Sequence, residues 1–244
     1  MLDNDDLPVG RLYTRRQALA ILGASGFAAL VGCPASSEGM TNTGNGTCVV
    51  RPALTEGPYF VDDKLLRSDI RSDPSDGSVR AGTMLALTVN VSRLASQACS
   101  PLVGALVDVW HCDAVGVYSD VSDPGFNTVG KRYLRGYQVT DANGQVSFLT
   151  IYPGWYSGRA THIHFKIRSP SGVSPAYQFT SQWFFDDSLS DTVQAAAPYT
   201  KGIAGRLRNT SDGIYNQGGS QLVLAASQAA QGYAATFNVA LQTS

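Results

Sequence analysis

The segment RYLRGYQVT-DANG-QVSFLTI, residues 132–151, decides the fold class of this chain. Two runs with the composition of β-strands, 132–140 and 145–151, flank Asp141-Ala142-Asn143-Gly144. Asn-Gly readily adopts the positive φ angles of a tight turn between paired strands. The segment therefore predicts a β-hairpin.

Short runs of alternating apolar and polar residues recur on both sides of this segment. Strands are expected at 85–91, 105–110, 162–168, 177–185 and 232–241. One helix is expected, beginning near Ser190 and ending before Pro198. Regular strand spacing without alternating helices predicts an all-β fold, an antiparallel β-sandwich with long loops and little helix.

The composition excludes two broad classes of protein. Of 244 residues, 43% are apolar and 15% charged, and 18 Lys and Arg against 19 Asp and Glu give a net charge of −1. A nucleic-acid partner is not expected, since that contact needs clustered basic residues. A disordered chain would be poorer in apolar residues and more strongly charged.

The first 33 residues have the pattern of an export signal. Arg15-Arg16 precede an uncharged apolar run, 18–31, that is too short to span a bilayer. This pattern is typical of twin-arginine export and predicts a periplasmic or extracellular protein. The alternative is a buried N-terminal helix. Leu30-Val31-Gly32-Cys33 resembles a bacterial lipobox, which predicts membrane attachment through lipidated Cys33.

Three segments follow from this division of the chain. Residues 1–33 form the predicted signal region, and the Ser-, Gly- and Asn-rich residues 34–47 form a flexible linker. The β-sandwich is expected from 48 to 244. In an oxidising compartment, Cys48, Cys99 and Cys112 permit one disulfide. Because Cys99 and Cys112 flank an expected strand that holds them apart, a pair that includes Cys48 is favoured, with its partner left open.

The strand at 162–168 carries the strongest chemical signal. In His162-Ile163-His164-Phe165, the two imidazoles share one face of the strand and the apolar side chains share the other. Residues i and i+2 lie about 7 Å apart at Cα, so the two imidazoles can converge on one metal ion. The alternative is a pair of surface histidines on a half-buried strand.

Two tyrosines in nearby turns favour the metal interpretation. Tyr156 lies just upstream of the histidines, in Pro153-Gly154-Trp155-Tyr156, and Tyr118 follows a strand that ends in a Gly-bearing turn. Phenolate oxygen suits Fe(III) better than Zn(II) or Cu(I), and only a strongly Lewis-acidic ion ionises two phenols at neutral pH. On sequence alone, Tyr152 is as good a candidate as Tyr156.

Three blocks of sequence together resemble the intradiol ring-cleavage dioxygenases, the non-haem Fe(III) family that includes catechol and protocatechuate dioxygenases. The blocks are Thr55-Glu56-Gly57-Pro58-Tyr59-Phe60, the strand and turn from 108 to 118, and Leu134-Arg135-Gly136 through Pro153-Gly154-Trp155-Tyr156 to His162-Ile163-His164. The resemblance implies one non-haem Fe(III) per chain. It also implies cleavage of a catecholic substrate by O2 between its hydroxyl carbons, giving a cis,cis-muconate-type diacid.

The resemblance also assigns roles to residues of this chain. It implies four metal ligands: Tyr118, which stays bound throughout turnover, Tyr156, which leaves when substrate arrives, His162 and His164.

Further roles implied by the resemblance concern the substrate. Arg159 matches a catalytic arginine, and Gln182 matches an amide close to the substrate. Gly57, Pro58 and Tyr59 match a loop that lines the substrate mouth.

Other residues favour structural interpretations. His111 is expected in a structural or supporting role, and Trp110 and Trp183 in the core or the pocket wall. Arg135 is expected to be sheet scaffolding. Two other functions are weighed: an exported, non-catalytic β-sandwich that binds a metal or phenolic ligand, and a copper or zinc hydrolase, for which no general-base carboxylate is evident. The identity of the catechol, the oligomeric state and the role of the last 50 or so residues stay open.

Overall fold

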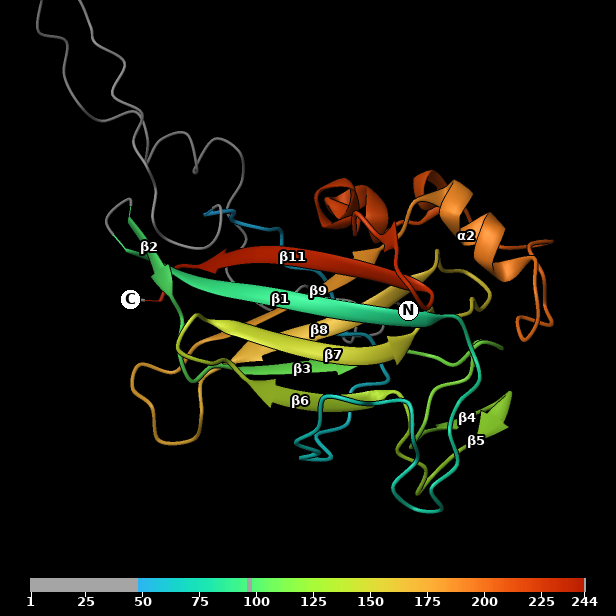
Figure 1. The fold of residues 1–244 in the computed structure, drawn as a ribbon, viewed down its shortest axis with the longest axis horizontal. Coiled ribbons are helices and arrows are strands. Elements are labelled where there is room, and N and C mark those ends of the chain that lie inside the picture. The colour runs from blue at the N-terminus through green and yellow to red at the C-terminus, as the bar shows by residue number, and fades with distance from the viewer. Residues whose placement is uncertain (1–47, 96–97, 244) are drawn as a thin grey trace, which may run out of the picture.

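The computed structural model describes residues 48–95 and 98–243, so the predicted signal region, the linker and Cys33 lie outside the described residues. The described chain is built mainly from β-strands, drawn in Figure 1. Their bounds are β1 Met84–Ala95, β2 Ala98–Pro101, β3 Leu106–Trp110, β4 Ser122–Asp123, β5 Phe126–Asn127, β6 Arg135–Val139, β7 Gln145–Ile151, β8 His162–Arg168, β9 Gln178–Phe184, β10 Ser227–Gln228 and β11 Tyr233–Leu241.

β1 organises the five-stranded sheet, because it has partners on both of its edges. On one edge β11 pairs with β1 from Leu85↔Tyr233 to Arg93↔Leu241, and β10 pairs with β11. On the other edge β7 and then β2 pair with β1 in series. The β1–β11 pair is parallel, whereas the other pairs between the named strands are antiparallel as expected. A parallel pair needs a long crossover connection, and here the whole of the four-stranded sheet lies between the two strands in sequence.

The second sheet is antiparallel, in the order β6-β3-β8-β9. Its alternating residues separate into two faces. Ile163, Phe165 and Ile167 of β8 are buried in the hydrophobic core. His162, His164 and Lys166 occupy the opposite face of the same strand, so the sequence prediction of two faces is confirmed.

The core lies between the two sheets. Leu85, Leu87 and Val89 point from β1 into this core, as their alternation predicts. Aromatic rings join the sheets directly: Phe237 of β11 lies with its ring centroid 5.6 Å from both Phe165 of β8 and Trp183 of β9. In Figure 1, β1, β7 and β11 cross in front of β3, β8 and β9. The all-β sandwich is therefore confirmed.

The predicted hairpin at 132–151 is only partly correct. The turn forms, with Gly144 at φ 71° and its N–H donating to Asp141 O over 2.9 Å. The two strands then separate, because β6 pairs with β3 in one sheet and β7 pairs with β1 in the other. Asn-Gly fixes the reversal of the chain, but the pairing partner is chosen by burial of β7 residues such as Phe148 in the core. The segment thus links the two layers.

Helical structure is sparse in the described residues. The helix α2, Asp187–Gln194, begins a few residues before the expected start, because Asp186 caps it by accepting from the N–H groups of Ser188 and Leu189. Three short 3-10 turns follow: η2 Asn209–Ser211, η3 Tyr215–Gln217 and η4 Gly219–Leu222. α2 lies outside both sheets (Figure 1). Within the described ranges, no helix combines the length and apolar character needed to span a bilayer.

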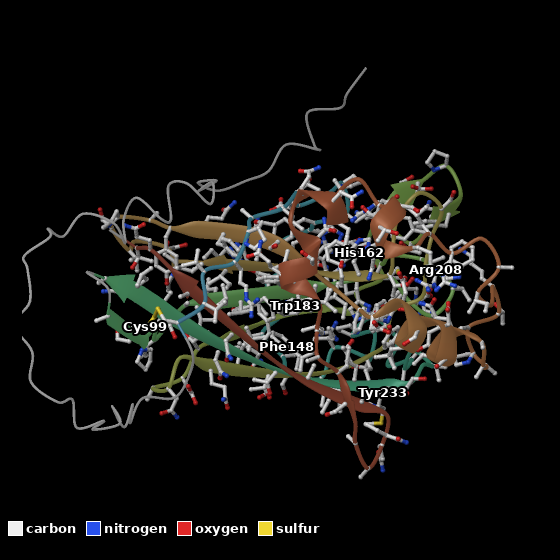
Figure 2. All side chains as sticks on the ribbon, turned by 90° about the horizontal axis from the view of Figure 1, so that it is seen from above. Cys99, Phe148, His162, Trp183, Arg208 and Tyr233 are labelled. Carbon is white, nitrogen blue, oxygen red and sulfur yellow. A yellow bond between two sulfur atoms is a disulfide. The ribbon has the colours of Figure 1, made fainter. Side chains whose placement is uncertain are left out.

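The disulfide joins Cys48 to Cys99, and Cys112 is a free, buried thiol. The expectation that Cys48 belongs to the pair is confirmed. Figure 2 shows Cys99 near one end of the long axis and His162 in the other half of the molecule. The disulfide therefore ties the start of the described chain to the β1–β2 hairpin, far from the histidine face.

Candidate active site

His162 and His164 converge on the outer face of the four-stranded sheet. Both are 2% exposed, and their Nε2 atoms lie 3.0 Å apart. His162 Nδ1 lies 2.7 Å from Ala160 O, so this nitrogen donates and leaves Nε2 with a free lone pair. Trp110, opposite His164 in the β3–β8 register, stacks on the His164 ring at 5.0 Å. The histidine face is thus a buried wall, and not the solvated face of the alternative interpretation.

A tight turn after β3 places Tyr118 next to the two histidines. Asp113 Oδ1 accepts the N–H groups of Val115 and Val117, both at 3.0 Å, and Gly116 adopts φ 81° between them. The Tyr118 side chain is 1% exposed, and its hydroxyl is buried without a hydrogen-bond partner among the described residues. A buried hydroxyl without a hydrogen-bond partner lowers the stability of the folded protein, and it is expected where a further group binds.

Tyr156 comes from a second turn that packs tightly against the first. A Cβ at Gly154 would lie 2.5 Å from Ala114 O, and one at Gly116 would lie 2.3 Å from Trp155 O. Only glycine permits this close approach of two backbones. As a result, Tyr156 Oη lies 3.2 Å from His162 Nε2, and the rings of Tyr118 and Tyr156 are 5.8 Å apart.

Burial controls the protonation of these four side chains. It lowers the pKa values of His162 and His164 well below the usual histidine value, and the nearby Arg159 guanidinium lowers them further. Burial likewise raises the pKa of Tyr156 to about 12 and that of Tyr118 well above its ordinary value. At neutral pH the residues alone therefore present two neutral imidazoles and two phenols.

This donor set fits a ferric ion. No group of three or more His, Cys, Asp and Glu side chains suited to a metal occurs in residues 48–95 and 98–243. The tyrosine oxygens must therefore complete any site built on the two histidines. Two phenols with raised pKa values ionise only beside a strong Lewis acid, and phenolate oxygen is a hard ligand. The Tyr118 hydroxyl, which has no hydrogen-bond partner among the described residues, and the two facing Nε2 atoms are the ligand atoms that such an ion would bind.

Arg159 and Gln182 lie together beside the four candidate ligands. The Arg159 guanidinium donates to Gln182 Oε1 at 2.6 Å, while Gln182 Nε2 donates to Thr55 O at 2.9 Å. Gln182 is completely buried, and the Arg159 side chain is 18% exposed. Gln182 lies directly opposite His164 in the β8–β9 register. The structure brings these two predicted residues together.

Asp212 is a site residue that the sequence analysis missed. It is fully buried, and its Oδ2 accepts from Arg159 Nε at 3.0 Å and from Ala160 N at 2.7 Å. Its Oδ1 accepts from the N–H groups of Ile214 and Tyr215. Asp212 belongs to the last 50 or so residues, which matched no recognised motif. The C-terminal residues thus orient Arg159.

The loop of Gly57, Pro58 and Tyr59 lies across the site. Gly57 approaches the His164 ring so closely that a Cβ there would lie 3.2 Å from His164 Cε1. Pro58 is exposed, and the Tyr59 ring stacks on the Tyr118 ring at 4.5 Å. Gly57 and Tyr59 therefore lie against two of the candidate ligands, and the role of this loop in lining a substrate mouth stays a prediction.

Arg135 holds two of these segments together. Its guanidinium is buried and donates to Tyr59 O at 3.1 Å, to Ser119 Oγ at 2.8 Å and to Ser119 O. One side chain therefore fixes the loop that carries Tyr59 and the turn that carries Tyr118. Arg135 therefore does more than support the sheet, because it also positions the two loops that carry Tyr59 and Tyr118.

His111 and Tyr152 are buried away from the candidate ligand atoms. His111 Nδ1 lies 2.7 Å from Cys112 O and its Nε2 lies 2.7 Å from Thr150 Oγ1, so both nitrogens are occupied. The Tyr152 hydroxyl bonds to Ser190 Oγ at 2.8 Å. The structural expectation for His111 agrees with these contacts, and Tyr152 is set aside in favour of Tyr156.

Comparisons with known proteins identify related chains. A family model described as Dioxygenase matches residues 55–243. The chain is similar to catechol 1,2-dioxygenase 2 of Acinetobacter lwoffii, with 32% identity over 49% of this chain and 46% of that protein. It is also similar to chlorocatechol 1,2-dioxygenase of Pseudomonas sp. strain P51, with 27% identity over 61% of each chain.

Among solved structures, the intradiol ring-cleavage dioxygenase of Tetranychus urticae shares 32% identity at a TM-score of 0.67. That similarity covers 80% of this chain and 95% of the mite protein. In contrast, the chain spans only about half the length of the curated relatives it matches.

Proposed function

The chain belongs to the dioxygenase family whose model matches residues 55–243, and from this premise we propose that it is an intradiol ring-cleavage dioxygenase. Its substrates would be a catechol and O2, and its product a cis,cis-muconate-type diacid. The observation that carries the proposal is the convergence of two imidazoles and two tyrosine side chains at one buried point. Intradiol cleavage is also the activity that the name of the mite protein states.

We propose that His162, His164, Tyr118 and Tyr156 hold one Fe(III). When bound, a ferric ion supplies Lewis acidity at this point. The rest of the proposed chemistry belongs to the side chains around it. Trp110 and Gly57 pack against the His164 ring and fix its orientation. The buried walls exclude water, which strengthens every electrostatic interaction inside the site.

Tyr156 is proposed to accept a proton from the substrate. Burial raises the pKa of its hydroxyl to about 12, so a free Tyr156 Oη holds a proton at neutral pH. A catechol brings two phenolic protons into the site. If a ferric ion held Tyr156 as a phenolate, its oxygen would accept one of these protons on release, because the free hydroxyl stays protonated at neutral pH.

Arg159 is proposed to stabilise negative charge that develops on the aromatic ring. Asp212 and Gln182 hold its guanidinium at two points, so its position is fixed before the substrate arrives. A preorganised positive charge in a site with little water needs no reorganisation during the reaction. Gln182 is itself held by Thr55 O, which extends this arrangement to the loop at the mouth.

The proposal is tested on purified protein by metal analysis, visible spectroscopy and oxygen uptake. One iron per chain, a red colour from tyrosinate-to-iron charge transfer, and oxygen uptake with catechol that yields a muconate are expected. Protein stripped by a chelator should regain activity with iron and stay inactive with zinc. A colourless protein whose main metal is zinc would contradict the iron site. Iron binding without oxygen uptake would indicate a non-catalytic module, and semialdehyde products would indicate extradiol cleavage.

We also propose that the protein is exported, with lipidation at Cys33. The Cys48–Cys99 disulfide supports export, because structural disulfides form in oxidising compartments. Mass spectrometry of protein from the native host checks both points: cleavage before Cys33 with an added lipid is expected. An uncleaved N-terminus recovered from the cytoplasm would contradict the export proposal.

A further inference from the structure

The β4–β5 hairpin contacts the candidate site through Asp123. This small hairpin stands apart from the two sheets of the sandwich (Figure 1). Asp123 Oδ2 accepts a hydrogen bond of 2.7 Å from the Tyr59 hydroxyl, and its Oδ1 accepts from Gly125 N at 2.8 Å. Phe126 of the same hairpin lies with its ring 6.5 Å from the Tyr59 ring. A carboxylate is therefore held at the outer edge of the mouth.

Tyr59 connects this carboxylate to the reacting centre. Its ring stacks on Tyr118 at 4.5 Å and meets Tyr156 edge-on at 6.3 Å. Its backbone carbonyl is held by Arg135 and its hydroxyl by Asp123, so both ends of the residue are fixed. A phenol has one proton to donate, and Tyr59 donates it to Asp123. Tyr59 thus offers an incoming molecule an acceptor lone pair and no donor.

The Asp123 carboxylate is ionised, and no Lys or Arg side chain in the described part of the chain pairs with it. Hydrogen bonds from Gly125 N and from Tyr59 lower its pKa below the usual aspartate value. In residues 48–95 and 98–243 Asp123 forms no ion pair, whereas Glu56, from the loop at the mouth, pairs with Lys166. Arg159 is matched by Asp212. The edge of the mouth next to Tyr59 therefore carries a net negative charge.

We infer that Asp123 is a specificity-determining residue, which makes the site favour catechols with a neutral or cationic ring substituent over catechols with a carboxylate. The inference rests on the proposed function and adds a substrate class to it. A ring substituent that faces Tyr59 lies next to a lone pair of the Tyr59 hydroxyl oxygen, and the negative charge of Asp123 lies just behind that oxygen. Hydroxyl and ammonium groups can donate to that lone pair, while a carboxylate has no proton to donate and is repelled.

Three catechols of similar ring size and different charge test this inference. Protocatechuate is an anion at neutral pH, catechol is neutral, and dopamine is a cation. Their kcat/KM values are measured by oxygen uptake in the iron-loaded wild type and in Asp123→Asn, which removes the charge and keeps one of the two acceptor oxygens. The control is Asp69→Asn, which removes the same charge from an aspartate paired with Arg71.

Opposite changes for the two charged substrates are expected. Asp123→Asn should raise kcat/KM for protocatechuate by about 3- to 10-fold, lower it for dopamine by a similar factor, and change it for catechol by less than about 2-fold. Higher salt should reduce both effects, and Asp69→Asn should leave all three values unchanged. Parallel changes for all three substrates, or none, would overturn the inference while oxygen uptake with catechol still supported the proposed function. No uptake with any substrate would overturn both.

Discussion

Replacing Asp212 with Asn removes one charge and one acceptor atom from a fully buried side chain without changing its size. Each carboxylate oxygen of Asp212 serves two donors: Arg159 Nε and Ala160 N on one side, Ile214 N and Tyr215 N on the other. An amide has a single oxygen. In Asp212→Asn an NH2 group must therefore face one of the two donor pairs, and the guanidinium loses the one ion-pair partner it has among residues 48–95 and 98–243.

The expected loss of stability follows from these contacts. Two hydrogen bonds are lost, one of them to a charged group, at about 1–3 kcal/mol each, and a largely buried guanidinium stays unpaired. The middle of that range for the two bonds is about 4 kcal/mol, which corresponds to a fall in Tm of about 8–16 °C for a chain of this size. Activity should fall as well, since Arg159 would keep only its bond to Gln182. A loss of about 10- to 100-fold in kcat, with a smaller change in KM, is expected for a misplaced charge that acts in the transition state.

Oxygen uptake with catechol, normalised to bound iron, and a thermal melt measure the two effects on the same samples. Asp191→Asn is the matched control, because Asp191 also pairs with arginines of the C-terminal region, Arg206 and Arg208, away from Arg159. The control should lower Tm and leave kcat per iron unchanged. If Asp212→Asn lowered Tm but kept kcat, or if both variants lost kcat equally, Asp212 would have a structural role only.

Three further predictions concern other parts of the molecule. Tyr118→Phe should weaken the visible charge-transfer band, while Tyr152→Phe should keep it; equal spectra would refute the choice of ligand. Cys48→Ser should lower the free energy of unfolding by about 4 kcal/mol, because it opens the loop that the bond to Cys99 closes. A thermal melt measures this loss, and an oxygen-uptake assay should show an unchanged kcat. His111 is buried and its pKa is lowered to about 4, so the unfolded chain binds a proton first as pH falls. Stability from His111 should be complete above pH ~6.5 and decline towards pH ~4 by about 3 kcal/mol, a decline that His111→Gln should lack in denaturant titrations.

The sequence predicts those features that depend on local periodicity. Alternation in 162–168 correctly separates the histidine face from the core face, and the Cys48 pairing follows from the length of a strand. Local pattern cannot choose between sheets, so the turn at 141–144 was correctly predicted and the pairing of its strands was not. The parallel β1–β11 pair was also missed, because it joins residues that lie far apart in the chain.

The candidate site shows the same division. Periodicity identifies His162 and His164, but only a family resemblance separates Tyr156 from Tyr152, because both residues lie in the same short segment. Asp212 had no local signal, since its partner Arg159 lies in another part of the chain and its importance comes from complete burial. Arg135 looked like sheet scaffolding because the two carbonyl groups it holds belong to loops whose paths are set by tertiary packing.

The parallel pairing of β11 with β1 also determines when the five-stranded sheet can be completed during synthesis of the chain. Residue 85 leaves the ribosome long before residue 241, and at about 5–20 residues per second the interval is about 8–30 s. Once residue 151 has been made, β7 can occupy one edge of β1, but the other edge stays open with its apolar residues incompletely covered. Asp212 is synthesised within the same interval, so Arg159 gains its partner only near the end. Synthesis of the last strand is therefore the event that closes the sandwich, and nascent chains should depend on protection from aggregation until then.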